Sequence, residues 1–217
     1  MILSTDTAAK VGEFLLDAKA VILRPEEPFT WASGWKSPIY CDNRKTLSYP
    51  AARTFIRNAM VEAIQQQFGT PDVIAGVASG GIAQGALVAQ EMELPFIYIR
   101  SKAKGHGLTN AIEGAYEADQ KVVVIEDLVS TGGSSLKAVE ALRAAGCEVV
   151  GMIAIFTYGF QLAEDNFANA NVELVTLSDY NNMVQLAVSR GTISEADVTS
   201  LAEWRNAPHQ WGQPQNT

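Results

Sequence analysis

The sequence contains few of the cysteines and histidines that could form disulfide bonds or bind a metal. Only two cysteines, Cys41 and Cys147, and two histidines occur in 217 residues. Thiols so far apart in the chain form neither the ligand spacing of a zinc site nor the disulfide framework of a small secreted domain. We therefore expect both cysteines to be reduced and structural, with Cys147 packed where a helix turns into the next strand.

Long hydrophobic segments are also missing. The longest apolar run, residues 149–156, is far shorter than the roughly 20 residues that a membrane-spanning helix needs. Residues 1–6 lack the charged start and the apolar core of a signal peptide. We therefore expect a cytoplasmic protein that makes no membrane contact.

Positive charge is scarce. Sixteen Lys and Arg residues stand against 24 Asp and Glu residues, which gives a net charge of −8 and a pI near 4.8. Binding to nucleic-acid backbones requires an extended basic face. The composition therefore argues against a nucleic-acid partner, although a local basic loop could still bind a small anion.

No internal repeat or low-complexity block divides the chain, and its length allows one sizeable core. Helical patterns occur at residues 7–19, 50–68, 81–92, 134–145, 180–190 and 194–206, and strand patterns at 73–77, 96–99, 122–125, 149–156 and 173–177. This alternation predicts an α/β fold, a doubly wound and mainly parallel sheet with helices on both faces. We expect a single domain over residues 1–206 and a loosely ordered tail over residues 207–217.

The most informative segment is residues 122–135, in which a buried strand leads into two carboxylates and then into a hydroxyl-rich and glycine-rich turn. The unbroken β-branched run at 122–125 is typical of a strand covered on both faces. Glu126 and Asp127 then stand at its carboxyl end, where open α/β sheets bind ligands. The periodic segment after the turn predicts a helix whose N-terminus faces a bound anion.

These residue types suit a ribose 5-phosphate. Adjacent carboxylates can accept hydrogen bonds from two ribose hydroxyls and lie near a bound Mg²⁺, while the turn donates N–H and O–H groups to a phosphate. The alternative is an ordinary strand end followed by a turn with a serine N-cap. The residues of the predicted sugar-phosphate site are Glu126, Asp127, Leu128, Val129, Ser130, Thr131, Gly132, Gly133 and Ser134.

Two other segments carry chemistry. Residues 98–110 place Arg100, Lys104 and His106 close together without helical or strand periodicity. We interpret them as a mobile cationic loop that neutralises a departing pyrophosphate, although a charge run is often only a solvated surface. Residues 73–85 form a glycine-rich strand-to-helix turn that matches neither a Walker A motif nor a dinucleotide fingerprint. From its residues alone, a tight turn without a ligand explains it equally well.

The strand, acidic pair and hydroxylated turn together resemble the signature shared by phosphoribosyltransferases. The Arg-x-x-x-Lys-x-His-Gly spacing that starts at Arg100 and the segment 29–42 resemble orotate phosphoribosyltransferases, bacterial branch. These motifs, in the family's order, cover most of the first 160 residues. The resemblance implies a type I phosphoribosyltransferase fold, with a small hood over about residues 1–48 and a core over about residues 49–206.

The resemblance implies transfer of a 5-phosphoribosyl group from 5-phospho-α-D-ribose 1-diphosphate (PRPP) to orotate. The products would be orotidine 5′-monophosphate and pyrophosphate, in de novo pyrimidine synthesis. Mg²⁺ is implied as a cofactor held mainly by the substrate, without dedicated protein ligands. A homodimer is also implied, in which the cationic loop of one subunit acts in the site of the other. Residues 73–85 become the pyrophosphate loop by the same analogy.

The residues implied as catalytic are Lys104, His106 and Asp127. Arg100 joins Lys104 and His106 around the pyrophosphate, and Ser130 also touches orotate. The chain departs from the family pattern at two positions: Ala32 stands where many members carry a Lys, and Tyr158 stands near an orotate-binding Arg. The sequence does not show which groups replace these cations.

Two other functions fit parts of the pattern. A phosphoribosyltransferase for another base would share the sugar-phosphate site, but the segment 29–42 and the Lys-x-His-Gly loop favour orotate. A non-catalytic sensor of the diphosphate sugar would keep the sugar site. Such a regulator would be expected to lose the loop cations and to carry a basic DNA-binding extension, and this chain shows neither feature.

Overall fold

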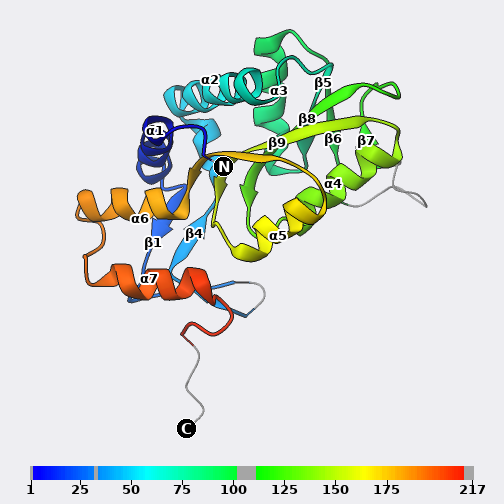
Figure 1. Ribbon diagram of the computed structural model, residues 1–217. Helices are drawn as coiled ribbons and strands as arrows, with labels where there is room; N and C mark the ends of the chain where they lie inside the picture. The colour runs from blue at the N-terminus through cyan, green and yellow to red at the C-terminus, as the bar shows by residue number, and fades with distance from the viewer. Residues whose placement is uncertain (1, 32–33, 102–110, 213–217) are drawn as a thin grey trace.

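The computed structural model describes residues 2–31, 34–101 and 111–212. Within these residues a six-stranded sheet has the strand order β10, β9, β8, β5, β6, β7 (Figure 1). All neighbouring strands run parallel except β6 and β7. The predicted α/β fold with a mainly parallel sheet is therefore confirmed. The strands are β5 (Val73–Val77), β6 (Phe96–Ile99), β7 (Ile112–Glu113), β8 (Lys121–Val129), β9 (Glu148–Thr157) and β10 (Leu174–Asp179).

Helices cover both faces of this sheet because its central strands are apolar on both sides. In β8, Val123 and Ile125 belong to one buried cluster with α1, α2 and α3, whereas Val122 and Val124 belong to a second cluster with α4 and α5. Figure 1 shows the two helical layers. The helices are α1 (Thr5–Asp17), α2 (Pro50–Gln67), α3 (Gly80–Met92), α4 (Gly133–Ala144), α5 (Gln161–Asn169), α6 (Tyr180–Ser189) and α7 (Asp197–Asn206).

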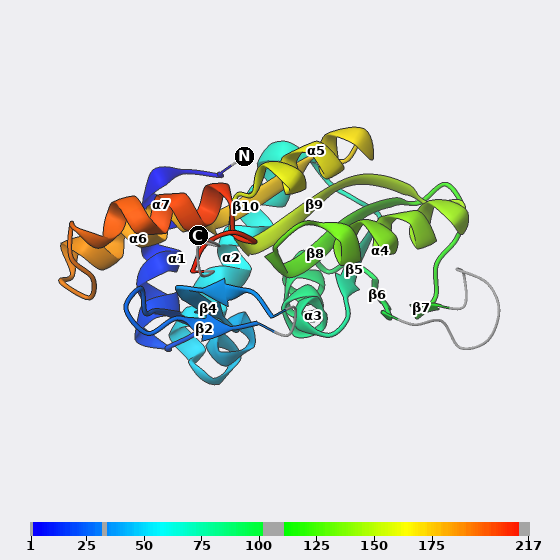
Figure 2. The same ribbon diagram turned by 90° about the horizontal axis from the view of Figure 1, so that it is seen from below.

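The N-terminal part adds two small antiparallel pairs outside the main sheet. Strand β1 (Val21–Leu23) pairs with β4 (Ile39–Cys41), and β2 (Phe29–Thr30) pairs with β3 (Lys36–Ser37). The 3₁₀ helix η1 (Asn43–Ser48) follows β4. This region lies beside α7 (Figure 2), where the fully buried Trp204 donates a hydrogen bond to the Lys36 carbonyl at 3.2 Å. The division into a hood and a core stays a prediction.

The two edges of the main sheet differ in length. On one side β7 contributes two residues. On the other side the edge strand is β10, which has six residues. There Ile2 forms a single bridge with Thr176, and the Leu3 N–H donates to the Thr176 carbonyl at 3.2 Å. Within the described residues, the N-terminal segment therefore meets the β10 edge at Thr176.

The structure differs from the predicted elements in several places. Strand β8 continues to Val129, because Val129 still pairs with Thr157 of β9, so the acidic pair lies inside the strand and not after it. Helix α5 and the short hood strands were not predicted. Residues 207–212, expected to be loosely ordered, contact the body: the Trp211 indole donates to the Ser200 hydroxyl at 3.1 Å.

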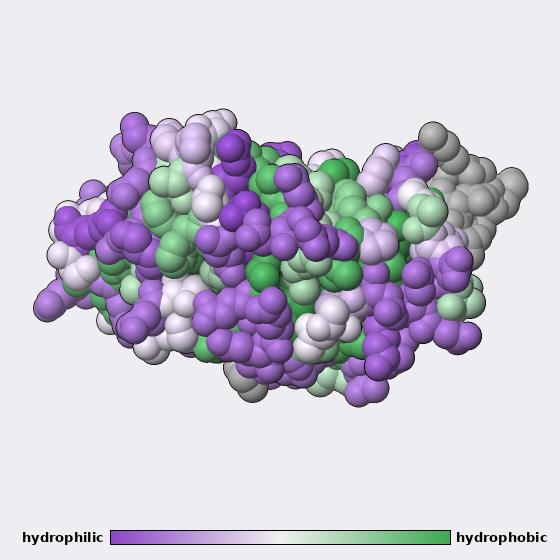
Figure 3. Space-filling model, turned by 90° about the horizontal axis from the view of Figure 1, so that it is seen from above, coloured by the Kyte–Doolittle hydropathy of each residue, from purple (hydrophilic) through white to green (hydrophobic). Residues whose placement is uncertain are grey.

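The described surface is mixed in polarity. On the face seen from above in Figure 1, apolar side chains form scattered patches among hydrophilic ones (Figure 3). In the described part of the chain, no helix combines the length and the apolarity needed to cross a bilayer. Cys147 is buried directly after α4, as predicted.

Candidate active site

A cleft of about 320 Å³ lies at the carboxyl ends of the central strands. The turn between β5 and α3 forms one wall, and the end of β8 with Ser134 of α4 forms another. The hood residues Cys41, Asp42 and Arg44 complete the lining. A larger hollow of about 730 Å³ lies between the β1–β2 segment and the α6–α7 loop. The cleft at the strand ends is the better candidate because ligands of parallel sheets bind at this edge.

Glu126 and Asp127 have different environments although they are neighbours. Glu126 is 5% exposed and accepts hydrogen bonds from the Ser135 hydroxyl at 2.8 Å and the Asp127 N–H at 3.0 Å. Burial, and then the Asp127 carboxylate, raise the pKa of Glu126 to about 8. Asp127 is only half-buried. The raised pKa favours the protonated form of Glu126, in which this carboxyl can donate as well as accept a hydrogen bond.

Glycine at positions 80 and 81 lets the β5–α3 turn pass directly beside β8. A Cβ atom at Gly80 would meet the Asp127 carboxylate, and one at Gly81 would meet the Ile125 carbonyl oxygen. Close packing therefore explains these two glycines without any ligand. The same packing places Ser79 and Gly80 in the lining of the cleft, but their role toward pyrophosphate stays a prediction.

The turn after β8 leaves the N-terminus of α4 without a side-chain cap. Gly132 has a φ of 81°, and a Cβ atom there would lie 2.7 Å from the Phe167 ring. Asn166 fixes the turn by donating its side-chain amide to the Thr131 carbonyl at 2.9 Å. Gly133 and Ser134 are exposed at the start of α4. The first backbone N–H groups of this helix can therefore bind an anion.

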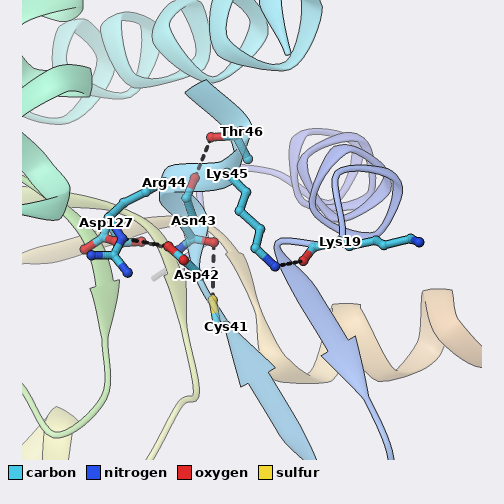
Figure 4. A network of polar contacts seen from close by, with 8 residues as sticks. All are labelled: Lys19, Cys41, Asp42, Asn43, Arg44, Lys45, Thr46 and Asp127. Carbon is cyan, nitrogen blue, oxygen red and sulfur yellow. Dashed lines mark hydrogen bonds and ion pairs between the residues drawn. The ribbon is translucent and has the colours of Figure 1, made fainter. Parts of the chain in front are cut away.

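Asn43 connects the hood to the acidic strand (Figure 4). It is 1% exposed and donates its side-chain amide to the Asp127 carbonyl at 2.6 Å. Its own Oδ1 accepts from the Cys41 thiol at 3.3 Å, and its carbonyl accepts from the Thr46 hydroxyl at 2.7 Å. Burial, and then Asp127 and Asp42, raise the pKa of the Cys41 thiol well above its usual value. Cys41 is thus a neutral structural thiol.

Arg44 is the cation closest in sequence to this junction. Its Nε atom lies 2.7 Å from Oδ1 of Asp42. The hydrogen bond from Arg44 lowers the pKa of the Asp42 carboxyl. Both side chains line the cleft that contains Glu126 and Asp127.

The predicted sugar-phosphate residues converge, whereas Arg100, the one predicted loop cation that the structure describes, lines a different cleft. Glu126, Asp127, Leu128 and Ser134 line the cleft, and residues 129–133 lie between them. Arg100 follows β6 and forms an ion pair with Glu113 of β7 at 3.1 Å. It lines a neighbouring cleft of about 440 Å³, which shares lining residues with the first. Lys104 and His106 lie outside the described residues.

Tyr158 supplies no cation to the cleft. It is 4% exposed, and its ring lies 5.5 Å from Trp31 and 5.7 Å from Trp204. Burial raises its pKa well above the usual value, so its hydroxyl stays neutral. Ala32 lies outside the described residues.

Three residues of the site were not predicted from the sequence. Ser135 directly follows the predicted turn, so its position next to Ser134 could have indicated that it belongs to the site. Asn43 and Arg44 follow the hood segment in sequence, but only folding brings them to Asp127, 84 positions from Asn43. Among the described residues, no group of three or more His, Cys, Asp or Glu side chains is arranged to hold a metal ion.

Comparisons with known proteins identify the family. The family model for the phosphoribosyl transferase domain matches residues 47–189. The chain is 57% identical over 202 residues to the orotate phosphoribosyltransferase of Porphyromonas gingivalis, covering 93% of this chain and 96% of that protein. It is 52% identical to that of Listeria innocua, covering 94% of this chain and 97% of the relative.

Solved structures agree with these relatives. Orotate phosphoribosyltransferase from Aeropyrum pernix matches with a TM-score of 0.73 at 27% identity, over 85% of this chain and 99% of that chain. UMP synthase from Leishmania donovani matches with a TM-score of 0.76 at 29% identity, over 91% of this chain but only 42% of that longer chain. The chain therefore belongs to the phosphoribosyltransferase family, in its orotate phosphoribosyltransferase branch.

Proposed function

We propose that this protein transfers the 5-phosphoribosyl group of PRPP to orotate, forming orotidine 5′-monophosphate and pyrophosphate as a step of UMP synthesis. The observation that carries the proposal is the cleft itself. In it, a buried carboxyl, a half-buried carboxyl and an uncapped helix N-terminus lie along one short segment. The family membership of the chain supports the same assignment.

The end of β8 and the start of α4 offer binding groups for the two ends of a phosphorylated pentose. Glu126 and Asp127 would bind the ribose hydroxyls. Glu126 could donate a hydrogen bond, and Asp127 could accept one. The segment 128–134 would bind the 5′-phosphate through the first N–H groups of α4 and nearby hydroxyls. Ser130, in the same segment, is proposed to contact orotate as well.

Departure of pyrophosphate requires positive charge around the breaking bond. We assign this role to Arg100, Lys104 and His106, with Lys104 and His106 closest to the reacting oxygen and His106 as proton donor. Arg100 lines the neighbouring cleft and not the cleft that contains Asp127. By family membership, we propose that the loop acts in the site of the partner subunit of a homodimer.

The cleft also suits a divalent cation that arrives with the substrate. The described residues hold no group of three His, Cys, Asp or Glu side chains arranged for a metal ion, but the half-buried Asp127 in the lining offers an oxygen ligand of the kind that Mg²⁺ prefers. Mg²⁺ held mainly by the diphosphate and ribose oxygens would offset charge on the leaving group. The substrates are thus small anions, and we propose a cytoplasmic location and no nucleic-acid partner.

Activity with different bases tests the proposal. The purified protein should convert orotate and PRPP to orotidine 5′-monophosphate. Chromatography of the nucleotide product measures this conversion. Uracil, adenine, guanine and hypoxanthine in place of orotate should give far lower rates. A faster reaction with one of these bases would move the chain to another substrate, and binding of PRPP without turnover of any base would favour a sensor.

Calorimetry tests the sugar site separately. Asp127→Asn keeps the size of the side chain but removes the charge that accepts from the ribose. Affinity for PRPP should fall about tenfold or more, given the usual value of a hydrogen bond to a charged group. Unaltered affinity in a folded variant would remove Asp127 from the sugar site.

A further inference from the structure

The strongest unassigned feature of the cleft is the side chain of Arg44. It follows β4 and lies in the lining together with Asp42, Gly80 and Asp127. Its Nε atom lies 2.7 Å from Asp42 Oδ1, and its side chain is 57% exposed. The Asp42 carboxylate thus fixes one side of the guanidinium, while the remaining N–H donors stay available.

The charges around Arg44 are otherwise negative. Among the described residues that line this cleft, the other charged side chains are Asp42, Glu126 and Asp127. Arg44 is therefore the one cation that the described chain presents to its own sugar site. These carboxyl groups would repel a diphosphate, so a positive side chain beside them would favour its binding.

The opposite wall cannot supply that partner. The β5–α3 turn contributes Ser79 and Gly80 to the lining, and a side chain at position 80 would collide with the Asp127 carboxylate. The turn therefore offers backbone groups and a hydroxyl, but no charge. A diphosphate lying along this wall would face Arg44 from the hood.

We propose that Arg44 binds the diphosphate group of PRPP, and of the pyrophosphate product, within the subunit that holds the sugar. This inference rests on the proposed function and adds a binding residue to it. The cations at Arg100, Lys104 and His106 would come from the partner subunit, whereas Arg44 belongs to the subunit that holds the sugar. Asp42 is then a positioning residue, because it orients the guanidinium by a 2.7 Å contact.

A purely structural role for Arg44 predicts different behaviour. Loss of a solvent-exposed ion pair would change the stability of the protein little and would change no ligand affinity. The neighbouring Lys45 provides a matched control. It donates to the Lys19 carbonyl at 3.0 Å, on the side facing α1 (Figure 4), and is not part of the cleft lining.

The experiment compares Arg44→Gln, Arg44→Lys and Lys45→Gln in the full-length protein. Calorimetric titration with pyrophosphate in the presence of Mg²⁺ gives the dissociation constant, and steady-state kinetics give KM for PRPP and for orotate. Loss of a charge-assisted hydrogen bond should raise the pyrophosphate dissociation constant and KM for PRPP about tenfold or more in Arg44→Gln. Arg44→Lys should recover part of the affinity, because a point charge remains. Lys45→Gln should match the wild type.

Three results would overturn the inference. The first is unchanged pyrophosphate affinity in a folded Arg44→Gln variant. The second is a rise in KM for orotate alone, which would place Arg44 at the base. The third is an equal loss in Lys45→Gln, which would indicate a general charge effect. Absence of orotidine 5′-monophosphate formation by the wild type would instead refute the proposed function, independently of Arg44.

Discussion

Replacement of Glu126 by glutamine should make the stability of the protein less dependent on pH. Glu126 is 5% exposed, and burial together with the Asp127 carboxylate raises its pKa from 4.5 to about 8. In the unfolded chain this carboxyl returns to its ordinary pKa. Between about pH 4.5 and 8 the folded state therefore keeps a proton that the unfolded state releases. The contribution of this group to the unfolding free energy is complete below the pKa of the unfolded state. It is lost as the pH rises through the pKa of the folded state.

The size of the effect follows from the difference between the pKa of Glu126 in the folded and the unfolded state. At about 1.36 kcal/mol per pKa unit, a rise from 4.5 to about 8 corresponds to at most about 5 kcal/mol of unfolding free energy between pH 4 and pH 9. Water that enters the cleft once Glu126 ionises would relieve part of this penalty. We therefore expect the wild type to lose about 2–4 kcal/mol through this group. Glutamine keeps an acceptor for Ser135 but has no proton to lose.

Urea unfolding followed by circular dichroism between pH 5 and pH 9, without ligands, measures this difference. Wild type and Glu126→Gln should diverge as the pH rises, with the variant losing less stability. Glu148→Gln, which changes an exposed carboxylate on the neighbouring strand β9, should follow the wild type. Profiles of wild type and Glu126→Gln that stay parallel within about 1 kcal/mol would refute the argument from burial.

Three further predictions concern the cleft. Gly80→Ala forces a methyl group against the Asp127 carboxylate and should weaken PRPP binding about tenfold or more by calorimetry, since overpacking costs about 1–3 kcal/mol; wild-type affinity would show that the turn moves freely. Asn43→Ala removes the 2.6 Å hydrogen bond to the Asp127 carbonyl and should lower the unfolding free energy in urea by about 1–3 kcal/mol, whereas a smaller change would mean that water replaces the amide. Lys104→Ala should lower kcat by about 10² or more with the fold intact. Mixing this variant with inactive Asp127→Asn should restore activity in hybrid dimers. No recovery despite proven subunit exchange would argue against shared sites.

The sequence predicted the parts of the fold that local patterns determine. The β-branched run before Glu126 predicted a central strand, and the pattern after the turn predicted the helix that became α4. Pro50 marked the start of α2 correctly. The short hood strands were not predictable, because two or three residues are too few to show a strand period. Helix α5 was missed because only Ala163 and Phe167 are buried in it.

The site was predicted as far as it lies on one continuous segment. Residues 126–134 share a strand, a turn and a helix start, so their convergence follows from sequence order. The contact from Asn43 to Asp127 and the position of Arg44 in the cleft depend on how the hood docks. No local pattern encodes that docking, because it arises from packing such as the burial of Trp204 beside Lys36. The pKa of Glu126 likewise depends on tertiary burial.

The borders of the main sheet have a consequence for behaviour at high concentration. An unpaired strand edge is a template on which another chain can add a strand, and long flat edges are a common route to aggregation. In the described part of the chain, one border consists of the two residues of β7. The other is the six-residue β10, which Ile2 and Leu3 meet at Thr176. The N-terminal segment therefore occupies the middle of the longer border. Trimming the first three residues would free this position and should lower the concentration at which the protein precipitates.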